Sequence, residues 1–496
     1  MKVLEAEVGI DPVENSAVFR RVGFAFRPAL PEVANPPVTF PHVSLTSNGT
    51  PIPERQLMFR KSILWLHRWT GLAITAFIIV MAVTGTILAF HTELDRMLNP
   101  ALMTVPVRDA PLLDAVALRE RAAAMEPHAP FEYFNLKVTP GRSFCLGVVR
   151  AKTDPSTGKP YDLGFDQLYL DPYTGEKVGS RNSSHSLIPF LFNLHYGMTF
   201  GNRGVRLFGF ISLVWTITSI IGIYLTFPLL RRRSKASEQT TDTPKPTGRS
   251  WWRRWMPAWK IKWGGGTYRM SYDIHRAFGL WTWLLLFIFA WSGVALNLPA
   301  PYMRTMNFLR LTVRNSVGEH LTVPKKPPGP PALDWRAALE RGRVLIRETG
   351  LKEGYTVREE YFMRVLPYYG VYQYDVISSK APPGAEIQDA GVFIDANSGE
   401  LRDHWLLSKS PPGTIITRWL VALHMGTFLG LPMKILIFLS GIITTALCVT
   451  GVIIWWKKRV TPSVALADEQ EQTDATRSAT SGVRHFLTTL TNRPRV

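Results

Sequence analysis

Residues 67–90 have the sequence HRWTGLAITAFIIVMAVTGTILAF. From Gly71 to Phe90 this stretch contains no charged residue. About 20 helical residues cross the roughly 30 Å hydrocarbon core of a bilayer, so the stretch predicts a transmembrane helix. It begins too far into the chain, behind a proline-rich polar stretch, to be a cleavable signal peptide.

Three further apolar runs are long enough to cross a bilayer. They are approximately Leu207–Leu230, Phe278–Leu298 and Leu431–Trp456. The 496-residue chain is 46% hydrophobic and 19% charged, which leaves room for sizeable polar domains beside four membrane helices. Its two cysteines, Cys145 and Cys448, supply neither a disulfide framework nor a zinc pattern.

The formal net charge of +19 is concentrated in the flanks of these runs. By the positive-inside rule the basic flanks are cytoplasmic. We therefore expect a multi-pass protein of the bacterial inner membrane, with both termini cytoplasmic and with the segments at about 95–190 and 300–415 outside. Because this charge explains topology, binding to nucleic acid loses its main support. The basic residues are Arg55, Arg60, Lys61, Arg231, Arg232, Arg233, Lys235, Arg253, Arg254, Lys260, Lys262, Lys457, Lys458 and Arg459.

The chain contains an internal repeat. The first and third runs begin His-Arg-x-x-Gly, and each has a further glycine eighteen residues after its histidine. A Leu-His-x-Gly element precedes the second and fourth runs, with a glycine twenty-seven residues after its histidine. The gap-free spacing predicts a tandem parallel repeat about an axis normal to the membrane. The registered residues are His67, Gly71 and Gly85; His275, Gly279 and Gly293; His195, Gly197 and Gly222; and His424, Gly426 and Gly451.

The two outside segments also resemble each other. Residues 167–176 and 391–400 each have alternating apolar residues followed by a turn with Asp and Gly, and each follows a β-rich stretch, Phe144–Val149 or Val371–Ile377. We expect two small α+β domains there. The 1–55, 232–262 and 461–496 segments are predicted to be loops or disordered.

Topology decides which histidines can meet. His67 and His275 both lie at cytoplasmic helix ends, whereas His195 and His424 both lie at outer ends. Two sites are expected, each with one imidazole from each half, and haem iron with two axial ligands requires such a pair. Arg68 and Arg276 are candidate partners for haem propionates. Gly71, Gly279, Gly197 and Gly426 would let a flat macrocycle approach the backbone.

Simpler interpretations stay open for single residues. One interfacial histidine beside arginine is usually a snorkelling or capping residue, and Arg68 and Arg276 equally suit positive-inside anchors. Gly85, Gly222, Gly293 and Gly451 are typical of close helix packing. His91 ends the first run, where its counterpart in the third is Pro299. Four roles stay open for His91: it ligates the outer haem, lies over it, binds substrate or merely lies at the interface.

Helix length constrains the outer pair. Twenty-seven residues of continuous helix span about 40 Å, more than the hydrocarbon core. His195 and His424 must therefore lie near the outer interface, or their helices must break near Gly201 and Pro432.

These elements together resemble the PepSY-associated transmembrane family, whose members are often described as iron-regulated membrane proteins. The resemblance covers roughly residues 58–460. It rests on the two His-Arg-x-x-Gly starts, the run 84–90 leading to Glu93-Leu94-Asp95 and Asn99-Pro100, the two Leu-His-x-Gly elements and the two Asp-x-x-x-Gly-Glu turns. Members of this family include di-haem ferric-siderophore reductases of the inner membrane. The resemblance therefore implies two haem b groups and a role in iron acquisition.

The expected function is electron transfer across the membrane, from quinol or a cytoplasmic donor, to Fe(III) in a periplasmic siderophore. Hard oxygen ligands hold Fe(II) less well than Fe(III), so reduction favours release. Tyr361, Tyr368, Tyr369, Tyr372 and Tyr374 would line a chelate pocket or pack the strands. One alternative is a haem-free PepSY anchor that binds peptides or restrains a peptidase. A permease fits less well, because the runs contain no acidic residue.

The expected fold class is an α-helical membrane protein with four transmembrane helices as a tandem parallel repeat and two small PepSY-like α+β periplasmic domains. Its expected divisions are an N-terminal extension (1–57), transmembrane helix 1 (58–95), periplasmic domain 1 (96–190), transmembrane helix 2 (191–230), a basic linker (231–270), transmembrane helix 3 (271–299), periplasmic domain 2 (300–413), transmembrane helix 4 (414–458) and a C-terminal tail (459–496).

Overall fold

A computed structural model describes residues 54–229, 250–314, 321, 324 and 328–459. Most of the N-terminal extension and nearly all of the C-terminal tail lie outside the described residues. In the described part, four helices are long and apolar enough to cross a membrane, as predicted. They are α2 (Glu54–Leu88), α7 (Gly201–Thr226), α9 (Thr267–Asn297) and the fourth membrane helix, Leu431–Arg459.

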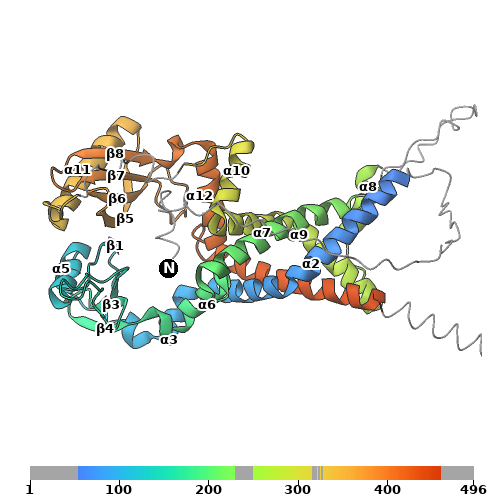
Figure 1. Cartoon of the computed structure of the whole chain (residues 1–496), viewed down its shortest axis with the longest axis horizontal. Coiled ribbons are helices and arrows are strands. Elements are labelled where there is room, and N and C mark those ends of the chain that lie inside the picture. The colour runs from blue at the N-terminus through green and yellow to red at the C-terminus, as the bar shows by residue number, and fades with distance from the viewer. Residues whose placement is uncertain (1–53, 230–249, 315–320, 322–323, 325–327, 460–496) are drawn as a thin grey trace, which may run out of the picture.

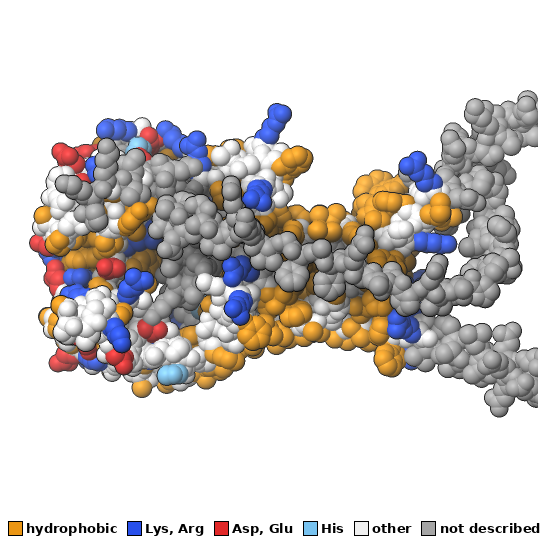
Figure 2. Space-filling view, viewed as in Figure 1, with side chains coloured by type: hydrophobic (Ala, Val, Ile, Leu, Met, Phe, Trp, Pro, Cys, Tyr) orange, Lys and Arg blue, Asp and Glu red, His pale blue; other side chains and the backbone are white. Residues whose placement is uncertain are grey.

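The four helices form one elongated bundle, with the β-strands at one end (Figure 1). We call this end the lobe end and the opposite end, where Arg55 and Arg459 lie, the basic end. In the bundle's middle, Phe77 of α2 meets Phe208 of α7 edge to face, with 6.3 Å between ring centroids. Apolar side chains line the outside of the helices between the two ends (Figure 2), as a lipid-facing surface requires.

Two short helices lead into α7 and the fourth membrane helix. They are α6 (Leu187–Gly197) and α12 (Pro412–Met425). After α6 the chain turns through Met198 and Thr199, which have φ of 51° and 62°. After α12 it turns through Gly426, Leu429 and Gly430, with φ of 70°, 59° and 57°. The breaks that helix length predicted are therefore present in both halves.

The strands form two antiparallel sheets. The larger has the order β1-β5-β6-β7-β8 and the smaller the order β2-β3-β4. Helix α11 (Trp335–Glu353) packs on one face of the larger sheet, and α5 (Ala115–Met125) packs beside the smaller one. The strands are β1 (Tyr133–Asn135), β2 (Phe144–Gly147), β3 (Gln167–Leu170), β4 (Lys177–Arg181), β5 (Val357–Leu366), β6 (Val371–Ser378), β7 (Ala390–Asp395) and β8 (Leu401–Leu406).

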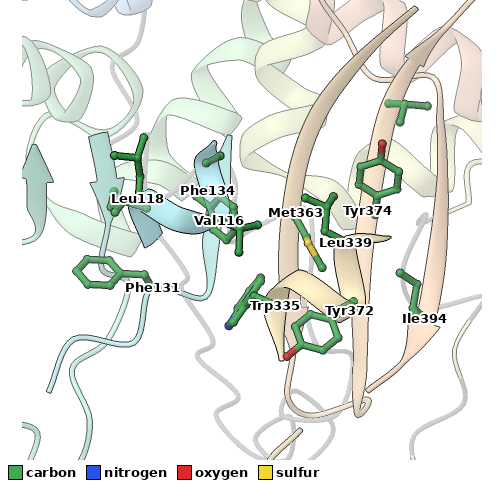
Figure 3. Close-up of a cluster of buried hydrophobic side chains, with 14 of the residues drawn as sticks. Val116, Leu118, Phe131, Phe134, Trp335, Leu339, Met363, Tyr372, Tyr374 and Ile394 are labelled. Carbon is green, nitrogen blue, oxygen red and sulfur yellow. The ribbon is translucent and has the colours of Figure 1, made fainter. Parts of the chain in front are cut away.

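The two outside segments are joined, whereas two small domains were expected. Strand β1 of the first segment pairs with β5 of the second, with Phe134 opposite Met363. One hydrophobic core also includes residues of both segments, and Phe134 packs on Trp335 with 5.2 Å between ring centroids (Figure 3). The physical reason is the sheet edge, because β1 satisfies the backbone groups along the edge of β5 that would otherwise stay unpaired. The result is two lobes that share a core.

The predicted strand-and-turn units are present in both lobes. In the first, the Asp171 carboxylate accepts hydrogen bonds from the backbone N–H groups of Tyr173 and Thr174. In the second, Asp395 accepts from those of Asn397 and Ser398. Among the five tyrosines considered for a chelate pocket, Tyr372 and Tyr374 are fully buried in the core, so these two pack the sheet.

Short helices connect the bundle to the lobes. Asp95 of α3 receives a bidentate contact from Arg181 of β4, at 2.8 and 2.7 Å, and this ion pair is largely buried. It fixes the first lobe to the end of the first membrane helix. The connecting helices are α3 (His91–Leu98), α4 (Pro100–Met103), η2 (Ser183–His185), α10 (Pro299–Phe308) and η5 (Leu407–Lys409).

Two short helices lie in the described end of the basic linker, which corrects the expectation of a loop or disorder for that part of 232–262. Residues Trp251–Trp255 form α8 and Met256–Trp259 form the 3₁₀ helix η4. Trp251, Trp255 and Trp259 recur every four residues, so they share one helical face. That face packs on Phe227 and on Leu280 of α9. The tryptophan spacing was the signal for this helix.

Candidate functional site

The first histidine pair lies inside the bundle towards the basic end. His67 extends from α2 and His275 from α9, and their ring centroids are 6.4 Å apart with the planes at 76°. The second pair lies where the bundle meets the lobes. His195 of α6 and His424 of α12 have centroids 6.2 Å apart with the planes at 70°. The structure therefore brings together both predicted pairs with nearly the same geometry.

The Nδ1 atoms of the first pair are held by backbone carbonyls. His67 Nδ1 lies 3.1 Å from the Thr218 carbonyl oxygen, and His275 Nδ1 lies 2.9 Å from that of Leu447. A carbonyl only accepts, so Nδ1 carries the proton and donates in both residues. Nε2 then keeps its lone pair, and no hydrogen bond to Nε2 is found in the part of the chain that the structure describes.

In the second pair, hydroxyl groups lie next to Nδ1 where the first pair has carbonyl oxygens. His195 Nδ1 lies 3.0 Å from Thr84 Oγ1, and His424 Nδ1 lies 2.5 Å from Ser292 Oγ. Both hydroxyls donate their own proton to a carbonyl one helical turn back, Val80 or Phe289. They must therefore accept from the imidazoles, which again leaves Nε2 as a free lone pair.

Sequence reasoning missed these hydrogen-bond acceptors. A signal existed for three hydroxyl groups, because Thr84, Ser292 and Thr450 each precede a registered glycine, and Thr450 Oγ1 lies 3.2 Å from His275 Nδ1. Thr218 and Leu447 each stand four residues before a registered glycine, but they act through their carbonyls. A backbone acceptor leaves no mark in residue type, so only the structure reveals it.

Three registered glycines pack against the paired rings. A Cβ at Gly85 would lie 2.9 Å from His195 Cε1, and one at Gly222 would lie 3.2 Å from His67 Cε1. At Gly451 it would lie 3.4 Å from His275 Cε1. The fourth differs, because a Cβ at Gly293 would meet Ser212 Oγ at 2.5 Å. Close packing is thus correct for these glycines, and in three cases the packed group is an imidazole.

The glycines nearest the histidines divide into two kinds. A Cβ at Gly71 would have no heavy atom within 4 Å, and one at Gly279 would meet only Leu447 Cδ2, at 4.0 Å. Each lies one turn beyond its histidine on the same helical face, so space is open beside both rings of the first pair. By contrast, Gly197 and Gly426 belong to the breaks, where Gly197 packs on Val205 and Gly426 has a φ of 70°.

The distance between the rings fits two ligands on one metal ion. A metal–imidazole nitrogen bond is about 2 Å long, and the nitrogen lies about 1 Å from its ring centre, so opposite ligands have centroids roughly 6 Å apart. The described residues contain no group of three or more His, Cys, Asp or Glu side chains arranged to hold a metal. A metal bound here would need its remaining ligands from another source, such as a planar macrocycle.

The two candidate arginines differ. Arg276 donates to the Asp273 carboxylate and to the Pro257 carbonyl, at 2.9 and 2.8 Å. Asp273 has 0% exposure and also accepts from Arg269. This carboxylate lies in the first two turns of α9, before the apolar run Phe278–Leu298, which contains no acidic residue. Arg68 is half-buried and has no hydrogen bond or ion pair to the described residues, so of the two it is free to bind an anionic group.

His91 lies beside the second pair without joining it. Its ring packs edge to face on Phe192 of α6 at 5.3 Å between centroids, and its Nδ1 donates to the Leu88 carbonyl at 2.9 Å. The Glu93–Lys434 ion pair, at 2.6 Å, lies in its neighbourhood. The structure thus places His91 at the bundle surface of the lobe end, one helix away from the paired rings.

The sequence model of the PepSY-associated TM region matches residues 64–458, which includes all four membrane helices and both lobes. The chain belongs to the PepSY-associated TM region family. The match begins three residues before His67 and ends seven residues after Gly451, so it contains both histidine pairs of this family member. A comparison with curated proteins finds no match.

Proposed function

We propose that this PepSY-associated protein is a di-haem reductase of the inner membrane that delivers electrons to Fe(III)-siderophores on the side of its lobes. The observation that carries the proposal is the pair of facing imidazoles, repeated near both ends of the bundle with centroids at 6.4 and 6.2 Å. Haem b bound between each pair would supply reversible one-electron chemistry of iron.

The residues of the chain orient the ligands. Each imidazole is held through Nδ1–H, which fixes the tautomer and raises the basicity of Nε2. Gly85, Gly222 and Gly451 fix the ring positions from the side. The open space beside Gly71 and Gly279 suits a flat macrocycle, and Arg68 is available for a propionate. These features support the first site most fully.

The position of the second pair supports the choice of substrate side. His195 and His424 lie on α6 and α12, the helices that join the bundle to the lobes. With the basic flanks in the cytoplasm, the lobes are periplasmic. A ferric siderophore bound against the lobes would lie near the outer pair, and a cytoplasmic donor or quinol would reduce the inner one.

The test is the visible spectrum and the haem content of detergent-purified protein from haem-sufficient cells. We expect about two six-coordinate haem b groups per chain, and reoxidation of the reduced form by a ferric siderophore. His67→Ala or His275→Ala should remove one haem, and His195→Ala or His424→Ala the other. His185→Ala is the matched control, because this exposed histidine of η2 has no ring partner among the described residues.

The outcomes separate the proposal from its rival. A colourless protein, or equal spectra of all five variants, would reject the reductase and favour a haem-free anchor whose lobes bind peptides. Two haems without reoxidation by ferric siderophores would keep the electron conduit and reject the substrate.

A further inference from the structure

The C-terminal end of the basic linker forms a cap on the basic end of the bundle. We call residues 250–263 the tryptophan cap. Trp255 and Ala258 are buried against Leu280 of α9 and Phe227, and Trp255 Nε1 donates to Thr226 Oγ1 at 3.1 Å. Arg276 of α9 donates to the Pro257 carbonyl at 2.8 Å. The cap is therefore fixed to the ends of α7 and α9.

The outer surface of the tryptophan cap combines exposed aromatic and basic side chains. Trp252 is 62% exposed and Trp263 is 74% exposed. Arg253, Lys260 and Lys262 are exposed between them. Residues 250–272 contain no Asp or Glu. The next acidic residue, Asp273, accepts from the Lys262 backbone N–H, but its buried carboxylate forms ion pairs with Arg269 and Arg276. Tryptophan beside lysine and arginine is the composition of a segment that lies in a lipid headgroup region.

Two half-buried arginines anchor the cap. Arg254 donates through one terminal nitrogen to the Leu229 carbonyl at 3.2 Å, and Arg276 uses a terminal nitrogen for Pro257 and Asp273. The Nε atoms of both residues are buried, so they are closed to a ligand from outside, and the contacts with a ligand fall to the exposed side chains of the cap.

We propose that the tryptophan cap binds the headgroups of anionic phospholipids in the leaflet at the basic end. Trp252 and Trp263 enter the boundary between headgroups and acyl chains, and Arg253, Lys260 and Lys262 meet lipid phosphates. Charge complementarity and the continuity of the cap with the apolar surface of the bundle select lipid as the occupant. This proposal is independent of haem.

The test measures lipid binding by the full chain. Purified protein in a neutral detergent is titrated with phosphatidylglycerol or phosphatidylcholine, and bound lipid is counted by native mass spectrometry. The cap variant is Arg253→Gln/Lys260→Gln/Lys262→Gln. A matched control, Arg304→Gln/Arg347→Gln/Lys352→Gln, removes the same charge from exposed residues of α10 and α11.

We expect the chain to prefer phosphatidylglycerol, and the cap variant to bind it roughly tenfold or more weakly, as loss of three basic residues at a membrane surface predicts. The control variant should bind like the parent chain. Equal binding of the two lipids, or the same loss in both variants, would overturn the proposal.

Discussion

Each paired histidine is oriented through Nδ1 by an oxygen acceptor on a neighbouring helix, and His275 has two such acceptors, the Leu447 carbonyl and Thr450 Oγ1. For His424 the acceptor is Ser292 Oγ, which is fully buried. If the outer pair binds haem as proposed, this hydrogen bond tunes the iron through its ligand.

We therefore expect Ser292→Ala to retain two haems per chain but to shift the reduction potential and the electron paramagnetic resonance spectrum of one of them. Haem affinity at that site should fall by about 10- to 100-fold, the usual effect of losing such a partner. Ser440→Ala is the control, since the hydroxyl of this buried serine donates to the Ile437 carbonyl on its own helix. Identical spectra of the two variants would contradict the assignment.

Asp375 is a second residue whose environment has a measurable consequence. It lies on β6 with 1% exposure and accepts hydrogen bonds from Gln373 Nε2 and Trp405 Nε1, at 2.8 and 3.1 Å. Burial raises the pKa of its carboxyl to about 6. The folded state thus holds a proton that the unfolded state releases near pH 4, so this group destabilises the fold as pH rises from about 4 to 6.

Asp375→Asn should remove that pH dependence. The free energy of unfolding of the variant minus that of the parent chain should increase by roughly 2 kcal/mol between pH 4 and pH 7. Thermal or denaturant unfolding of the detergent-purified protein across this range measures the difference. Stability curves that run parallel would show that the carboxyl titrates normally.

The residues of the site were predictable to different degrees. Histidines at registered spacing predict both pairs, because a tandem repeat places equivalent positions on facing helices. Arg276 was a weaker prediction, since Asp273, three residues earlier on the same helix, is its partner, and this local i,i+3 spacing was present in the sequence. The backbone acceptors at Thr218 and Leu447 leave no trace in the sequence.

At the scale of elements, the breaks before α7 and the fourth membrane helix decide where the second pair lies. Helix length predicts from the sequence that these breaks exist, but it does not predict their backbone conformation. Thr199 adopts a φ of 62°, a region that β-branched residues strongly disfavour. Its place in the tight turn between α6 and α7 imposes this conformation.

Thr199→Gly should therefore stabilise the protein by about 1 kcal/mol, because glycine adopts this conformation without steric strain. Gly201 has a φ of 57° in the same turn. Gly201→Val, which replaces glycine by a β-branched residue there, should destabilise the protein. Melting midpoints of the two variants should move in opposite directions. A decrease for both would indicate that the Thr199 side chain stabilises the break.

The order of α8 and η4 shows how an element can be missed. Its charge and its prolines indicated a loop, whereas the four-residue spacing of Trp251, Trp255 and Trp259 specifies a packed face. Apolar periodicity over a single short segment is a weak signal, and the bundle end that completes it is distant in sequence.

At the scale of the whole molecule, the lobes are stabilised jointly. Phe134 is 1% exposed and is the link between β1, Trp335 and the larger sheet. The sequence predicted the strands and turns of each lobe, but pairing between β1 and β5 is a long-range contact that local patterns do not specify.

Phe134→Ala should destabilise both lobes by about 3–5 kcal/mol, the usual effect of deleting a buried phenylalanine. Limited proteolysis should then cut the first and second lobes at similar rates while the bundle stays intact. Leu351→Ala is the control, because Leu351 is 87% exposed. Cleavage confined to the first lobe would show that the lobes unfold independently.

The pairing of β1 with β5 also sets an order of events during biosynthesis. Strand β1 leaves the ribosome before α7 and α9, whereas β5 follows both. The edge of β1 therefore stays unpaired until α7 and α9 have been inserted into the membrane. During that interval the unpaired edge of β1 is accessible to chaperones and proteases. If α9 fails to insert, β5 does not reach β1, and the first lobe stays incomplete and accessible to them.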